Sequence, residues 1–156
     1  DLKPGKRLFM FATGTGLAPF LSVIQDPETY ERFEKVVLLH GVRYVSELAY
    51  SEFIEQELPE HEFFGEDVRN KLIYYPSVTR EEFRNQGRVT DLIATGKLFE
   101  DTGLPPLDPA LDRAMICGGP AMLTDCCKML DARGFKISPN IGAPADYVIE
   151  RAFVEK

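Results

Sequence analysis

The sequence predicts an α/β domain of three layers, in which helices cover both faces of a mainly parallel, five-stranded sheet. Two observations support this prediction. Five short apolar runs are each typical of a strand, and helical segments separate them, which is the pattern of repeated βαβ units. The chain has 156 residues, of which 44% are hydrophobic and 28% charged, as in a single globular domain.

The first expected strand is the apolar run at residues 8–12, which leads into a glycine-rich turn. The residues of this turn are Thr13, Gly14, Thr15 and Gly16. Glycine has no Cβ, so the backbone can turn tightly and approach a ligand closely. Pro19 suits the first turn of the helix that follows, whose free N–H groups attract anions. The pattern predicts a phosphate-binding cradle, with an ordinary strand-to-helix turn as the alternative.

Two further strands are expected in the middle of the chain, at residues 35–41 and 71–75. Between them, Ser46 is the expected N-cap of an amphipathic helix that ends at Pro59. Pro76 directly follows the third apolar run, and we expect it to end that strand.

The last part of the chain predicts one more βα unit and a final strand. Residues 87–98 are expected to be mostly helical, and the fourth strand is expected at 114–117. Pro120 begins the next helix, which Gly134 ends as the residue after its last turn. The fifth strand is expected at residues 147–153.

Three arginines, Arg43, Arg80 and Arg88, come after the second and third strands. Ligands of parallel sheets bind at the carboxyl ends of the strands, and NAD sites usually have an Asp or Glu there. No such carboxylate is obvious in this sequence. Because guanidinium groups form short, charge-assisted bonds with phosphate, the arginines predict a site for an adenosine 2′-phosphate. The alternative is that they are solvated surface charges.

Three segments match, in the right order, the ferredoxin–NADP reductase family: residues 12–20, 117–122 and 147–156. The first resembles the family's nucleotide-binding domain, and the other two are similar to its bacterial branch. The resemblance covers nearly the whole chain and implies a Rossmann-like NADP(H)-binding domain at residues 7–156, with a C-terminal tail that contacts flavin. Residues 1–6 resemble the linker from an FAD-binding barrel, so we expect the chain to be part of a reductase about twice its size.

The resemblance also implies roles for individual residues. Arg43, Arg80 and Arg88 would bind the 2′-phosphate of NADP(H), assisted by the hydroxyl of Thr79. The remaining cofactor-binding residues implied are Gly118, Gly119 and Pro120 at the nicotinamide end, Ala152 facing the flavin ring, and Phe153 nearer the adenine.

Two residues are the catalytic candidates. We expect Cys117 to face the crevice, and the resemblance implies that it lies close to the nicotinamide carbon that exchanges hydride. It would act as part of the pocket wall rather than as a nucleophile; the simpler alternative is a small buried apolar side chain. The family residue that Glu150 resembles approaches both rings and handles a proton or charge. A surface ion pair with Arg151 is the alternative for Glu150.

The implied activity is hydride transfer between NADP(H) and FAD, with single-electron exchange with ferredoxin or flavodoxin. Without its FAD-binding domain, the chain alone is expected to be inactive. One alternative is the corresponding domain of an NADH-dependent, oxygenase-type reductase. The other is a dinucleotide-binding module without activity of its own.

Net charge, hydropathy and cysteine spacing argue against several other classes of protein. A net charge of −7 argues against a nucleic-acid partner, and no apolar run approaches the ~20 residues of a membrane span. Cys117, Cys126 and Cys127 lack the spacing of a metal site, so no metal is expected. Adjacent Cys126 and Cys127 would not readily pair with each other, and a reducing, cytoplasmic location is the simplest account.

Overall fold

The computed structural model describes residues 2–137 and 144–150. Its strands are β1 (Arg7–Thr13), β2 (Lys35–Val42), β3 (Leu72–Val78), β4 (Asp112–Cys117) and β5 (Tyr147–Ile149). Its α-helices are α1 (Ala18–Ile24), α2 (Pro27–Arg32), α3 (Gly65–Lys71), α4 (Val89–Ala94), α5 (Lys97–Thr102) and α6 (Pro120–Ala132). Shorter helical turns are η1 (Gly14–Leu17), η2 (Val45–Glu47), η3 (Phe53–Glu57) and η4 (Leu58–Glu60).

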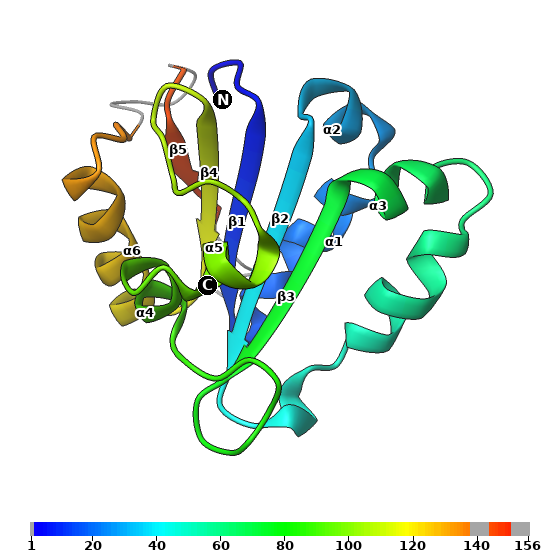
Figure 1. Ribbon diagram of the computed structural model, residues 1–156, viewed down its shortest axis with the longest axis horizontal. Helices are drawn as coiled ribbons and strands as arrows, with labels where there is room; N and C mark the ends of the chain where they lie inside the picture. Colours follow the sequence, from blue (N-terminus) through cyan, green and yellow to red (C-terminus); the bar gives the residue numbers. More distant parts are fainter. Residues whose placement is uncertain (1, 138–143, 151–156) are drawn as a thin grey trace, which may run out of the picture.

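The five strands form one sheet in the order β3-β2-β1-β4-β5, and every neighbouring pair is parallel. Helices cover both faces of this sheet, with α4, α5 and α6 on one side and α1 on the other (Figure 1). The predicted three-layer α/β fold is therefore confirmed.

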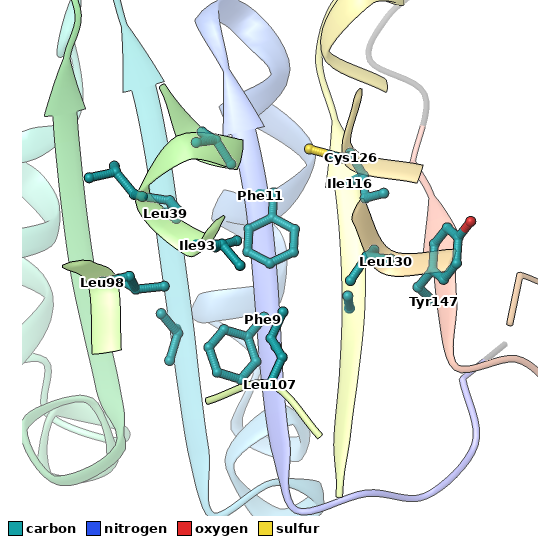
Figure 2. Packing of buried hydrophobic residues seen from close by; sticks show 14 of the residues in the cluster. Phe9, Phe11, Leu39, Ile93, Leu98, Leu107, Ile116, Cys126, Leu130 and Tyr147 are labelled. Atoms are coloured by element: carbon teal, nitrogen blue, oxygen red, sulfur yellow. The ribbon is translucent and has the colours of Figure 1, made fainter. Parts of the chain in front are cut away.

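The alternation of side chains along β1 explains why this strand is apolar throughout. Phe9 and Phe11 pack into a core with residues of α4, α5 and α6, whereas Leu8 and Met10 pack on the opposite face with residues of α1, α2 and α3. Figure 2 shows the first of these cores, where Phe9 and Phe11 lie among apolar side chains of neighbouring strands and of the covering helices. Both faces of the central strand are thus buried.

A buried ion pair joins the first residues of β1 and β4. The guanidinium of Arg7 donates to both carboxylate oxygens of Asp112, at 2.6 and 2.5 Å, and Asp112 is fully buried. Further donors of the same guanidinium reach the carbonyl oxygens of Pro105 and Pro106. This pair joins the central strand β1 to its neighbour β4 at the end of the sheet opposite the predicted site.

Three expected elements are wrong in detail. The strand β3 continues through Pro76 to Val78, because β3 lies at the edge of the sheet, where an outward-facing position needs no N–H donor. The expected helix from Ser46 is broken into short turns, and Ser46 lies inside η2 rather than at a cap. The segment 87–98 is not one helix, because Gly96 adopts a left-handed φ of 82° and separates α4 from α5.

The other expected helix boundaries agree with the structure. The last helix, α6, begins at Pro120, and Gly134 follows it with a φ of 91°, as predicted for a C-terminal glycine. No helix within the described residues is long and apolar enough to cross a membrane.

Candidate functional site

Two glycine turns meet where the strand order reverses, between β1 and β4. A Cβ on Gly16 would collide with the carbonyl group of Cys117, lying 2.7 Å from its carbon. A Cβ on Gly118 would collide with the Thr13 hydroxyl and lie 2.8 Å from the sulfur of Met122. The two turns therefore pack directly against each other. At Gly16, where the clash is with backbone atoms, only glycine fits. Parallel sheets bind ligands at such a switch point.

The other two glycines of these turns are not needed for packing. Gly14 adopts a left-handed φ of 53°, and no atom lies within 4 Å of the position of a Cβ there or at Gly119. Gly119 precedes the first residue of α6, and Gly14 begins η1, which includes Thr15. The structure therefore leaves open space beside the backbone of Gly14 and of Gly119, which is room for a ligand to approach closely.

The buried ring of His40 contacts the glycine turn at residues 13–16. Its ring is buried, and Nε2 lies 3.1 Å from the carbonyl oxygen of Gly14, to which it donates in the neutral tautomer. Burial lowers the pKa of His40 below its usual 6.5, so the ring is neutral at pH 7. This buried residue therefore positions Gly14.

A cavity of about 250 Å³ opens at the carboxyl ends of β1, β2 and β3. It is lined by Thr13, Gly14, Gly41, Val42, Arg43, Glu47, Thr79, Arg88, Val89, Thr90, Met122 and Asp125. Five of the predicted cofactor-binding positions outside the nicotinamide end line this cavity: Thr13, Gly14, Arg43, Thr79 and Arg88.

A second cavity adjoins the first and has a basic wall. Its lining residues are Arg43, Thr79, Arg80 and Arg88. These are the four residues expected at the 2′-phosphate, and the structure brings all four together. The loop that carries Arg80 and Arg88 follows β3 at the carboxyl end of the sheet (Figure 1). Three arginines and a threonine around one cavity suit a phosphate group.

The expectation that no carboxylate accompanies these arginines is wrong. Glu47 lines the first cavity, and its Oε2 lies 3.4 Å from a terminal nitrogen of Arg43. Asp125 of α6 also lines this cavity, 4.0 Å from the guanidinium of Arg88. Arg43 precedes η2, so the pair does not lie on one helix. The signal that could have revealed it is a Glu at the third position of a helical turn, which bonds back to the N–H of the cap residue Tyr44. No local pattern links Arg88 with Asp125, which meet only through the packing of α4 against α6.

The catalytic candidates lie at the ends of adjacent strands, Cys117 as the last residue of β4 and Glu150 directly after β5. The N–H of Glu150 donates to the carbonyl oxygen of Ile116 at 2.8 Å, which carries the β4–β5 pairing one residue beyond β5 and places Glu150 beside Cys117. Cys117, however, has no exposed surface and packs in the apolar core on the α1 side of the sheet. The expectation that its side chain faces the crevice is therefore wrong; its backbone forms the contact with Gly16.

Some predicted positions are outside the structural description. Arg151, Ala152 and Phe153 lie beyond the described residues, as does the rest of the expected tail. Glu150 is half-buried. Among residues 2–137 and 144–150, no cluster of three or more His, Cys, Asp or Glu side chains is arranged to hold a metal ion.

Comparisons with known proteins agree with this geometry. Residues 10–128 match the family model described as the oxidoreductase NAD-binding domain. Over its whole length the chain is 69% identical to a ferredoxin–NADP reductase of Pseudomonas aeruginosa, of which it covers 60%. It is 48% identical to a flavodoxin/ferredoxin–NADP reductase of Rhodobacter capsulatus, a match that covers 98% of the chain and 56% of that relative. The chain thus spans little more than half the length of these relatives.

A solved structure gives the same result in three dimensions. A ferredoxin NADP⁺ reductase from Neisseria gonorrhoeae, with bound FAD and NADP, superposes with a TM-score of 0.81 at 29% identity. The superposition covers 97% of this chain and 58% of that one. These similarities confirm the family resemblance that the three sequence motifs indicate.

Proposed function

Since this chain belongs to the family of oxidoreductase NAD-binding domains, we propose that it is the NADP(H)-binding half of a flavin-dependent ferredoxin or flavodoxin–NADP reductase. The observation that carries this proposal is the cavity lined by Arg43, Thr79, Arg80 and Arg88, which matches the charge and hydrogen-bonding needs of a 2′-phosphate. Relatives at up to 69% identity that are named as such reductases support the activity.

The residues present fit a dinucleotide along the carboxyl ends of the strands. The arginine-lined cavity would hold the adenosine 2′-phosphate. The first glycine turn, at Gly14, would lie along the pyrophosphate, where its open backbone offers N–H groups. Gly119 and the start of α6 would face the nicotinamide, because the space beside Gly119 is open. When bound, NADP(H) and FAD supply the hydride chemistry, which the protein directs by orientation and exclusion of water.

The chain's own groups at the reactive end are Glu150, directly after β5, and Cys117, at the end of β4. Within this proposal, the half-buried Glu150 carboxylate holds a charge or proton close to the reacting rings. The buried Cys117 supports the wall of the site through its packing, since burial leaves its thiol no route to act as a nucleophile. Ala152 and Phe153 are proposed to continue this end as the flavin-contacting tail.

The proposal extends to the whole protein. Residues 1–6 are proposed to join this domain to an FAD-binding barrel, and ferredoxin or flavodoxin is the proposed electron partner. We place the protein in the cytoplasm, because the adjacent thiols of Cys126 and Cys127 are not in disulfides.

A second candidate function is that of an NADH-dependent reductase. The carboxylate of Glu47 beside Arg43 favours it, since carboxylates in NAD sites accept a hydrogen bond from the ribose 2′-hydroxyl.

Steady-state kinetics of the complete, flavin-loaded protein with an artificial electron acceptor separate these functions. The proposal expects turnover with NADPH at a kcat/KM well above that with NADH. Higher kcat/KM with NADH would establish the second candidate, and a protein that binds nucleotide without turnover would be a binding module.

A further inference from the structure

The side chain of Glu47 is tied to the turn that carries Arg43. Its Oε1 accepts hydrogen bonds from the backbone N–H groups of Arg43, at 2.9 Å, and of Tyr44, at 3.1 Å. Its Oε2 lies 3.4 Å from a terminal nitrogen of the Arg43 guanidinium. The hydrogen bonds from Tyr44 and Arg43 lower the pKa of Glu47, so the group is a carboxylate at pH 7. A fixed negative charge therefore stands beside one of the three site arginines.

The two carboxylate oxygens of Glu47 have different hydrogen-bond partners. Oε1 caps the turn, which a neutral amide oxygen could do as well. Oε2 engages only the guanidinium of Arg43 among the hydrogen bonds that Glu47 makes in the described part of the chain. Arg43 lines both cavities, whereas Glu47 lines only the one without Arg80. A phosphate in the basic cavity must therefore share Arg43 with Oε2.

The effect of this charge depends on the ligand. A phosphate monoester carries about −1.5 to −2 charges at pH 7, so a neighbouring carboxylate repels it and competes for its arginine. A ribose hydroxyl carries no charge and can donate a hydrogen bond to a carboxylate. Glu47 thus opposes a 2′-phosphate and does not oppose a 2′-hydroxyl.

We infer that Glu47 is a specificity-determining residue that limits the preference of this site for NADP(H) over NAD(H). The inference rests on the proposed function, because it assumes that the basic cavity holds the 2′-phosphate. This role explains why a carboxylate typical of NAD sites lies among arginines typical of NADP sites. The arginines raise the preference for NADP(H) over NAD(H), and the carboxylate lowers it.

Calorimetric titration of the complete protein with NADP⁺ and with NAD⁺ tests this role in the variant Glu47→Gln. Glutamine keeps an oxygen for the two backbone donors and removes the charge. We expect NADP⁺ to bind about two- to fivefold more tightly, the range of an exposed ion pair, and NAD⁺ to bind equally well or more weakly. The gain should shrink as salt is raised, because the interaction is partly exposed.

Glu55→Gln is a matched control. Glu55 pairs with Arg84 as Glu47 does with Arg43, and the two carboxylate side chains are similarly exposed, at 34% and 37%. Glu55 lines neither cavity. This variant has the same change in net charge, so its affinities for both nucleotides should equal those of the wild type.

The possible results separate the inference from the proposed function. Weaker or unchanged NADP⁺ binding in Glu47→Gln, with the wild type still preferring NADP⁺, would overturn the role of Glu47 alone. An equal gain for both nucleotides would also overturn it. A wild-type protein that does not prefer NADP⁺ would instead contradict the proposed function.

Discussion

The backbone N–H of Arg80 donates a hydrogen bond of 2.9 Å to the carbonyl oxygen of Arg43. A second bond of 3.0 Å, from the N–H of Thr79 to the carbonyl of Val42, runs beside it. The turns after β2 and β3 are therefore one connected unit, although the two arginines are far apart in the sequence. This connection fixes the backbone from which both guanidinium groups reach the basic cavity.

The contact of the two glycine turns predicts a strong effect of Gly16→Ala. The added Cβ meets the backbone of Cys117, which cannot move without disturbing β4. We expect a loss of about 1–3 kcal/mol in the free energy of unfolding, as for overpacked sites. Urea denaturation measures this loss, and Gly119→Ala is the control, because no atom lies within 4 Å of its new Cβ. Equal losses in both variants would show that the turns do not pack as described.

His40 predicts how stability depends on pH. Burial lowers its folded-state pKa below 6.5, so on acidification the unfolded chain takes up a proton before the folded one does. Stability should fall as the pH drops below about 6.5, with a slope approaching ~1.4 kcal/mol per pH unit, until the folded-state pKa is reached. Urea denaturation between pH 5 and 7.5 tests this. His40→Gln, which keeps a donor for the carbonyl of Gly14, should flatten the dependence of the free energy of unfolding on pH. An unchanged slope would show that another titrating group causes this dependence.

Glu150 should affect catalysis rather than nucleotide preference. Its backbone bond to Ile116 places it beside Cys117, at the opposite end of the site from Arg80. In the complete, flavin-loaded protein, Glu150→Gln should lower kcat with NADPH and with NADH by the same factor. The ratio of the two kcat/KM values should not change. A selective loss with NADPH would place Glu150 at the 2′-phosphate instead.

The sequence was a good guide to the fold because the signals of its strands are local. The buried run of β1, the proline that begins α6 and Gly134 after that helix each depend on a few neighbouring residues. The prediction that Pro76 ends β3 is wrong, because whether a proline ends a strand depends on whether that strand lies at an edge of the sheet. The prediction that Ser46 is a helix N-cap is wrong, because the side chain of Glu47, rather than that of the serine, bonds to the backbone of the turn.

The site was predicted in part. The convergence of Arg43, Arg80 and Arg88 followed from their positions after strands, since parallel strands place these positions at one edge. Cys117 was misjudged, because the face of β4 on which its side chain lies, and the depth of its burial, depend on packing against α1. The pairing of Asp125 with Arg88 depends on how α6 lies against α4, which no local pattern specifies.

The most direct test of the central claim is the affinity of the Arg80→Ala variant for NADP⁺ and NAD⁺, measured by calorimetry. One charge-assisted phosphate contact contributes about 1.5–3 kcal/mol, so NADP⁺ binding should weaken about tenfold to a hundredfold. NAD⁺ binding should stay within about twofold, because NAD⁺ lacks the 2′-phosphate. Arg84→Ala, which removes an arginine of the same loop that lines neither cavity, should leave both affinities unchanged. An equal loss for NADP⁺ and NAD⁺ in Arg80→Ala would contradict a 2′-phosphate site at the basic cavity.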